Sequence, residues 1–106
     1  MSEIGFSLVE QGMAFAQARA AVLAADAANA RSPGFVARDL KPAVEVSGSG
    51  VRMASHLQAA TSAGTGGTIE FAMGATAQNS MRFRALADQE RAMLREFRTV
   101  AEGARR

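Results

Sequence analysis

The residues that could do chemistry are few, and they do not form a catalytic constellation. His56 is the only histidine, the chain has no cysteine, and its serines and carboxylates are scattered. A hydrolase, nuclease or transferase needs a base, a nucleophile or metal ligands that converge on one pocket. We therefore expect no enzymatic activity, no metal site and no cofactor, and we interpret His56 as a polar loop residue.

The stretch Gly64-Thr-Gly-Gly67 has a superficial likeness to a phosphate-binding loop. Such a loop follows a strand and ends in Gly-Lys-Ser/Thr, because the lysine and the hydroxyl contact the phosphates and their Mg²⁺. No strand is expected before this stretch, and no Gly-Lys-Ser/Thr follows it. The glycines therefore indicate a linker rather than a nucleotide site.

Arginines concentrate near the C-terminus, where nucleic-acid binding is the alternative to be weighed. These arginines are Arg82, Arg84, Arg91, Arg95, Arg98, Arg105 and Arg106. The carboxylates Asp88, Glu90, Glu96 and Glu102 offset much of their charge, and no aromatic platform for bases accompanies them. We expect a solvated face of mixed charge and no nucleic-acid partner.

The composition favours helices but supplies little core. The chain has 106 residues, of which 48% are apolar, but 24 are alanine, six are Phe, six are Met, and Trp and Tyr are absent. Alanine is the best helix former and buries little area. We expect a marginal monomer whose missing burial comes from partners.

The N-terminal residues do not read as a targeting segment. Glu3, Glu10 and Gln11 stand where a cleavable signal peptide would need a basic start and an apolar block. No run of about 18 apolar residues without charge occurs, so we expect no transmembrane helix.

Residues 1–31 are predicted to form one long helix. Apolar residues recur in steps of three and four at Phe6, Val9, Met13, Ala16, Ala20, Leu23, Ala27 and Ala30. A second stripe, Leu8, Phe15 and Val22, follows another face, and the only charges between Met13 and Ala30 are Arg19 and Asp26. A helix apolar on so much of its circumference must be buried on more than one side, which one partner helix cannot provide.

Residues 32–68 are predicted to be an irregular middle segment. Ser32-Pro33-Gly34 ends the first helix, because the residue before a proline disfavours helical torsions and Pro-Gly marks a turn. Val44-Glu-Val46 alternates briefly like a strand, residues 47–50 form a flexible turn, and residues 51–60 could form two or three helical turns.

Residues 69–106 are predicted to form the second long helix. Its apolar seam consists of Phe83, Leu86, Met93, Phe97 and Val100, interrupted only by Glu90. The expected fold class is therefore all-α, with two long terminal helices that form an antiparallel coiled-coil-like hairpin joined by the irregular segment.

The segment from Val22 to Asp39 resembles the signature of bacterial flagellar rod, hook and axial proteins, a helix that ends in Ala-Asn-x-x-Thr-Pro-Gly-Tyr/Phe. The continuation Ala37-Arg38-Asp39-Leu40 is most similar to the proximal rod (FlgB-type) proteins. The residues that carry the resemblance are Leu23, Asn29, Pro33, Gly34, Phe35, Arg38 and Asp39, with Phe83, Leu86, Met93 and Phe97 in the C-terminal segment. Asp26, Ala27 and Ser32 depart from the usual Asn, Ile and Thr, and residues 41–68 match poorly.

This resemblance implies a structural subunit of the proximal rod of the flagellar basal body, which assembles helically and transmits torque through the periplasm. It implies export by the flagellar type III apparatus without a cleaved signal peptide. The implied partners are further copies of the chain, other rod proteins, the MS-ring and rod-adapter proteins, and the export apparatus. Another flagellar axial or rod-adapter protein is the nearest alternative, and an arginine-rich helical nucleic-acid-binding protein is a more distant one.

Overall fold

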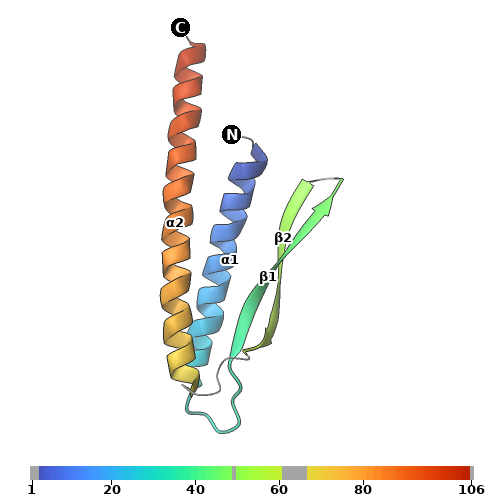
Figure 1. Ribbon diagram of the computed structural model, residues 1–106, viewed down its shortest axis with the longest axis vertical. Helices are drawn as coiled ribbons and strands as arrows, with labels where there is room; N and C mark the ends of the chain where they lie inside the picture. The colour runs from blue at the N-terminus through green and yellow to red at the C-terminus, as the bar shows by residue number, and fades with distance from the viewer. Residues whose placement is uncertain (1–2, 49, 61–66, 106) are drawn as a thin grey trace.

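A computed structural model describes residues 3–48, 50–60 and 67–105, and it contains two long helices and a β-hairpin. In chain order these are α1 (Glu3–Ala28), β1 (Arg38–Ser47), β2 (Gly50–Ala59) and α2 (Gly67–Ala104). The elements lie side by side, with α1 between α2 and the hairpin (Figure 1). The molecule measures 65 × 29 × 18 Å, so it is elongated and flat.

The prediction of an all-α fold is wrong, because Arg38–Ser47 and Gly50–Ala59 form a two-stranded antiparallel sheet and the fold is α+β. The strands pair from Arg38 opposite Ala59 to Ser47 opposite Gly50. The turn expected at residues 47–50 joins these strands, although residue 49 lies outside the described part. The linker expected at residues 63–68 also falls mostly outside it, and α2 begins at Gly67.

The helical turns expected at residues 51–60 are replaced by β2 for a physical reason. A helix of about ten residues is marginal in water when nothing covers it. The strand-forming pattern of Val44 to Val46 gives β2 a partner along its whole length. Strand propensity depends strongly on such neighbours, so pairing overrides the local helix preference of Met53, Ala54 and Leu57.

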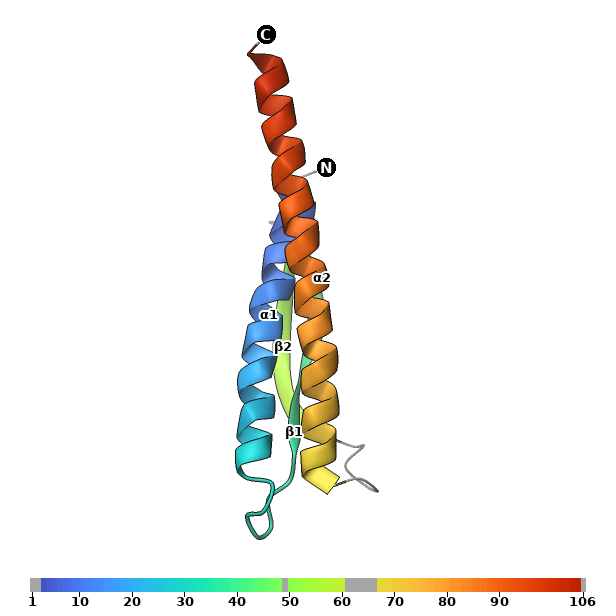
Figure 2. The ribbon, with the colours of Figure 1, turned by 90° about the vertical axis from the view of Figure 1, so that its left-hand side faces the viewer.

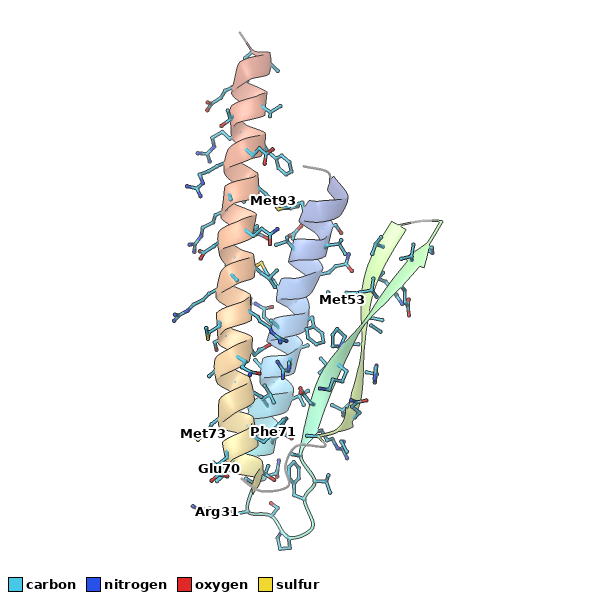
Figure 3. All side chains as sticks on the ribbon, in the orientation of Figure 1. Arg31, Met53, Glu70, Phe71, Met73 and Met93 are labelled. Carbon is cyan, nitrogen blue, oxygen red and sulfur yellow. The ribbon has the colours of Figure 1, made fainter. Side chains whose placement is uncertain are left out.

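The two helices pack antiparallel along one seam. Val9, Ala16 and Leu23 of α1 are buried there, and Met93 points from α2 toward α1 (Figure 3). The rings of Phe6 and Phe97 meet edge to face, with centroids 5.8 Å apart. Because α2 has 38 residues and α1 has 26, the C-terminal end of α2 extends beyond the start of α1 (Figure 2).

The hairpin covers a second face of α1. Leu8, Gln11, Phe15, Arg19, Val22 and Asp26 follow steps of three and four and so share one face of the helix. Gln11, Arg19 and Asp26 bond to the strands or their first residue, so this face meets the hairpin. The second covering element therefore belongs to the same chain. A third face, which carries Ala14, Ala18, Ala21, Ala25 and Ala28, stays exposed.

Gly12 allows α1 and α2 to approach closely. A Cβ at this position would lie 3.1 Å from Cδ1 of Leu86. We expect Gly12→Leu to destabilise the protein by about 1–3 kcal/mol, because extra side-chain volume would force the helices apart. The measurement is chemical unfolding at fixed protein concentration. Gly74→Leu is the matched control, since a Cβ at that helical glycine meets nothing within 4 Å.

None of the helices in the described residues is both long enough and apolar enough to cross a membrane.

Candidate functional site

The side chains singled out for possible chemistry do not gather at one place. His56 lies in β2, exposed and opposite Lys41, so it is a strand residue and not the loop residue expected from the sequence. Within residues 3–48, 50–60 and 67–105, no group of three or more His, Asp or Glu side chains is placed to hold a metal ion.

The most fully built polar site is the joint between α1 and the base of the hairpin. Arg19 Nε donates to Asp39 Oδ1 at 2.8 Å, and Arg19 Nη2 donates to Asp39 Oδ2 at 3.0 Å. Both side chains are buried, and the geometry is the two-pronged one that a guanidinium forms with a carboxylate. We call Arg19, Asp26, Asp39 and the backbone N–H of Arg38 the polar joint.

Asp26, which lies two turns after Arg19 on the same face of α1, completes the polar joint. Its Oδ1 accepts a hydrogen bond from the Arg38 N–H at 3.0 Å, which fixes the point where β1 begins. Asp26 is only 1% exposed, and its Oδ2 has no hydrogen-bond partner, nor does Nη1 of Arg19. The polar joint therefore contains one donor, Arg19 Nη1, and one acceptor, Asp26 Oδ2, that form no hydrogen bond, beside the Arg19–Asp39 ion pair.

Gln11 attaches the other end of the hairpin to α1. Its Oε1 accepts from the Met53 N–H at 2.6 Å, and its Nε2 donates to the Val51 carbonyl at 3.3 Å. A side-chain amide thus bonds to two backbone groups of β2, as a neighbouring strand would. Together with the polar joint, this contact fixes the hairpin on α1 at two points.

Burial alone would raise the pKa of the Asp39 carboxyl. The hydrogen bonds and positive charge of Arg19, the Leu40 N–H and the charge of Lys41 outweigh that effect, so the pKa lies below its ordinary value of 3.8. A carboxyl whose pKa is lowered on folding stabilises the folded state above the unfolded pKa.

We therefore expect the contribution of Asp39 to be present above pH 3.8 and to be lost as the pH falls below it. The measurement is the free energy of unfolding as a function of pH, for the natural chain and for Asp39→Asn. The variant should lose stability at neutral pH and show a shallower decline in acid. Parallel pH profiles would contradict the assignment.

The signature residues of the first helix and its exit have distinct structural roles. Leu23 is fully buried against α2, and Asn29, just after the end of α1, donates from its backbone N–H and its side-chain Nδ2 to the Ala25 carbonyl. Pro33 and Gly34 are exposed, and Gly34 has a φ of 73°, a conformation that favours glycine. Phe35 is half-buried, and its N–H donates to the Ser32 carbonyl.

The remaining signature residues fall into two groups. Arg38 and Asp39 meet in the polar joint, where Arg38 contributes its backbone N–H and Asp39 its carboxylate. Leu86, Met93 and Phe97 line the helix seam, while Phe83 is half-buried at its edge. The structure therefore assigns these residues to the framework and does not bring them together in one pocket.

Sequence reasoning did not identify Arg19, Asp26, Gln11 and Asn79 as site residues. Asn79 is buried and donates from Nδ2 to the Ala16 carbonyl at 2.8 Å, which joins the helices across the seam. The sequence did contain a signal for Arg19 and Asp26. They are the only charged residues between Met13 and Ala30, and they lie seven residues apart. Residues seven apart share a helix face, so both had to meet the same partner.

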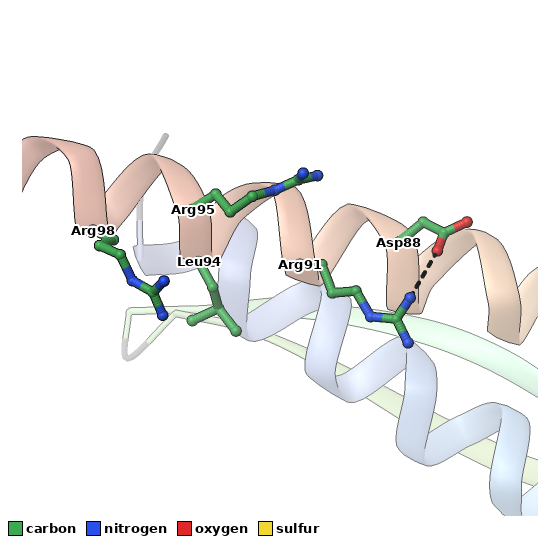
Figure 4. A pocket seen from close by; sticks show the side chains of 5 residues that line it. All are labelled: Asp88, Arg91, Leu94, Arg95 and Arg98. Carbon is green, nitrogen blue, oxygen red and sulfur yellow. Dashed lines mark hydrogen bonds and ion pairs between the residues drawn. The ribbon is translucent and has the colours of Figure 1, made fainter.

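The arginines of α2 form an open, shallow depression rather than a closed site. It is lined by Asp88, Arg91, Leu94, Arg95 and Arg98, and the arginine side chains spread apart and do not converge on one point (Figure 4). Arg91 Nη1 and Asp88 Oδ1 form an exposed ion pair at 3.5 Å. Exposed pairs of this kind contribute little to stability, and the depression carries three arginines against one aspartate.

Comparison of the chain with family models, curated proteins and solved structures found no match in any of the three.

Proposed function

We propose that the chain is a structural subunit of the proximal rod of the bacterial flagellar basal body, where copies assemble helically and transmit torque through the periplasm. The observation that carries the proposal is the distribution of large apolar side chains. Of those described, only Val9, Leu23 and Met93 are fully buried and nine are exposed, while the rest, all six Phe side chains among them, are half-buried. The exposed ones are Val36, Val44, Val46, Leu57, Ile69, Met73, Met81, Leu94 and Val100.

Such a distribution suits a subunit better than a free-standing protein. Each fully buried Leu, Val or Met side chain contributes about 1.5–3 kcal/mol, so three of them with a few alanines and half-buried side chains such as Phe6 and Phe97 make a small core. Large side chains left in water favour association with a further surface. An elongated molecule with a small core is consistent with a chain that buries its remaining apolar side chains when it assembles.

The flagellar part of the proposal rests on the resemblance at Val22–Asp39, a stretch whose residues act together in the fold. They end α1, turn the chain and lock the first residues of β1 onto α1 through Asp26 and Arg19. In the proposed function, this fixes the angle between the helical part of the subunit and its hairpin. Export without a cleaved signal peptide, and contacts with rod, adapter, MS-ring and export proteins, belong to the same proposal.

Deletion of the gene in the organism of origin tests the function. We expect loss of filaments and of the rod, seen by cryo-electron tomography of the cell envelope, with restoration by the natural gene. The tagged protein should co-purify with basal bodies. Intact rods in the deletion strain would overturn the proposal, whereas a rod that stops at a later level would favour another axial or adapter protein.

The purified chain provides a second test. We expect its helix content, measured by circular dichroism, to rise with protein concentration together with sedimentation rate. A cooperatively folded monomer at high concentration would count against assembly. A gel shift with nucleic acid at low salt, weakening steeply as salt rises, would instead support the arginine-rich binder.

A further inference from the structure

The hairpin presents an apolar face away from α1. Residues paired across antiparallel strands share a face, so Leu40 and Leu57 lie together, as do Val44 and Met53 and also Val46 and Val51. Asp39 belongs to the opposite face, and this face meets Arg19 of α1. We call Val44, Val46 and Leu57 the outer hairpin face; they are 63%, 78% and 47% exposed, whereas Leu40, Val51 and Met53 on the same side are half-buried.

This arrangement reverses the usual one. A half-exposed antiparallel sheet normally turns its apolar face to the core and its polar face to water. Here the face toward α1 carries Asp39 and Lys41, while branched apolar side chains project from the other face. An apolar patch in this position marks a surface that binds something.

The helix pair carries the second uncovered apolar surface. A groove between α1 and α2 is lined by Ala20, Leu23, Ala24, Ala27, Ala72, Met73, Thr76 and Ala77. An adjoining depression continues it past Ala20 to Phe83 and Arg84. We call the first of these the alanine groove. Its small side chains leave room for projecting ones, and it contains no charged residue.

The two surfaces cannot meet within one copy. Both strands pack on a different face of α1, and in the described residues neither strand contacts α2. The outer hairpin face has branched side chains that project, the alanine groove is recessed, and neither carries a charge that would repel the other. We propose that the outer hairpin face of one copy docks in the alanine groove of a second copy of this chain.

The contact is small and its two surfaces differ, so it favours a head-to-tail chain of weak contacts over an isolated dimer. A two-stranded face ten residues long covers roughly 300 Å², below the about 800 Å² per partner of a stable pairwise interface. Two different surfaces in contact form a head-to-tail interface, which continues from copy to copy. Each interior copy then uses both surfaces and makes two such contacts, while the area of each contact stays the same. This inference rests on the proposed function and specifies its self-contact.

Disulfide trapping tests the contact directly, because the chain has no cysteine of its own. The variants are Val44→Cys on the outer hairpin face and Ala24→Cys in the alanine groove. Oxidation of an equimolar mixture should give a heterodimer at about tenfold the yield of either variant alone, since docking raises the effective concentration of the thiols. The double variant should give a ladder of covalent oligomers.

Matched controls lie on the neighbouring faces. Ala18→Cys is exposed on α1 but outside the groove, and Gln58→Cys is exposed on β2 on the face opposite to Val44. Equal trapping at these positions would overturn the proposal. So would preferential dimers of Val44→Cys with itself, which would indicate a symmetric hairpin contact, or trapping only to a different protein in cell extract.

The test separates this inference from the proposed function. A ladder from purified chain, combined with intact rods in the deletion strain, would leave the contact standing and remove the flagellar assignment. Loss of rods combined with no specific trapping would leave the assignment standing and remove this contact. Circular dichroism of each variant shows whether helix content is retained, and Val46→Cys with Ala20→Cys provides a second pair should the first fail to fold.

Discussion

Arg19→Met is expected to destabilise the folded chain by about 3–5 kcal/mol, because it leaves the Asp39 carboxylate buried without its main partner. Lys41 lies 3.6 Å from Asp39 Oδ2 and is half-exposed, so it compensates in part and places the effect toward the lower end. The loss of stability should mainly weaken the attachment of the hairpin to α1. Hydrogen exchange of the β1 and β2 amides should accelerate more than exchange in the helix seam.

A double-mutant cycle separates the ion pair from the individual side chains. The double variant Arg19→Met/Asp39→Leu removes both charges of the ion pair, and it should be more stable than Arg19→Met alone, because the Asp39 carboxylate is no longer buried without its partner. Arg91→Met is the matched control, since that arginine forms only an exposed pair with Asp88, and its loss should cost less than about 1 kcal/mol. If Arg19→Met and Arg91→Met lowered the free energy of unfolding equally, the Arg19–Asp39 pair would not be a main source of stability.

Leu23→Ala is expected to cost about 2–5 kcal/mol, because Leu23 is fully buried at the seam and its loss leaves a cavity. The small core makes this a large fraction of the total stability. The measurement is chemical unfolding, with protein concentration held fixed because association shifts apparent stability.

Leu94→Ala provides the comparison for Leu23, since Leu94 is a helical leucine that is 48% exposed. Its substitution should cost less than about 1 kcal/mol in the monomer. If the two substitutions were equally costly, the antiparallel seam would not be the main source of stability. If Leu94→Ala impaired assembly without affecting the monomer, that exposed leucine would belong to a contact between copies.

The helices could be predicted from sequence because their signals are local and long. Steps of three and four from Phe6 to Ala30, and from Phe83 to Val100, describe helix faces without reference to the rest of the chain. The stop at Ser32-Pro33-Gly34 is equally local, and α1 ends at Ala28, just before it. The positive φ of Gly34 agrees with a turn there.

The hairpin could not be predicted in the same way, because its stability comes from pairing across a turn and from attachment to α1. Residues 51–59 contain Met53, Ala54, Leu57 and Gln58, which favour helix in isolation. The polar joint was missed for a related reason. Arg19 and Asp39 are twenty residues apart, and only the folded chain shows that a helix charge meets a strand charge.

Gln11 also affects how readily the edge of the hairpin can pair with strands of other molecules. A two-stranded ribbon has free backbone groups along both edges, and such edges recruit strands from other molecules and lead to aggregation. The Gln11 amide bonds to the Val51 carbonyl and the Met53 N–H of β2, close to the hairpin turn. A single side chain on a helix thereby occupies two of the backbone groups that an added strand would need at that end of β2.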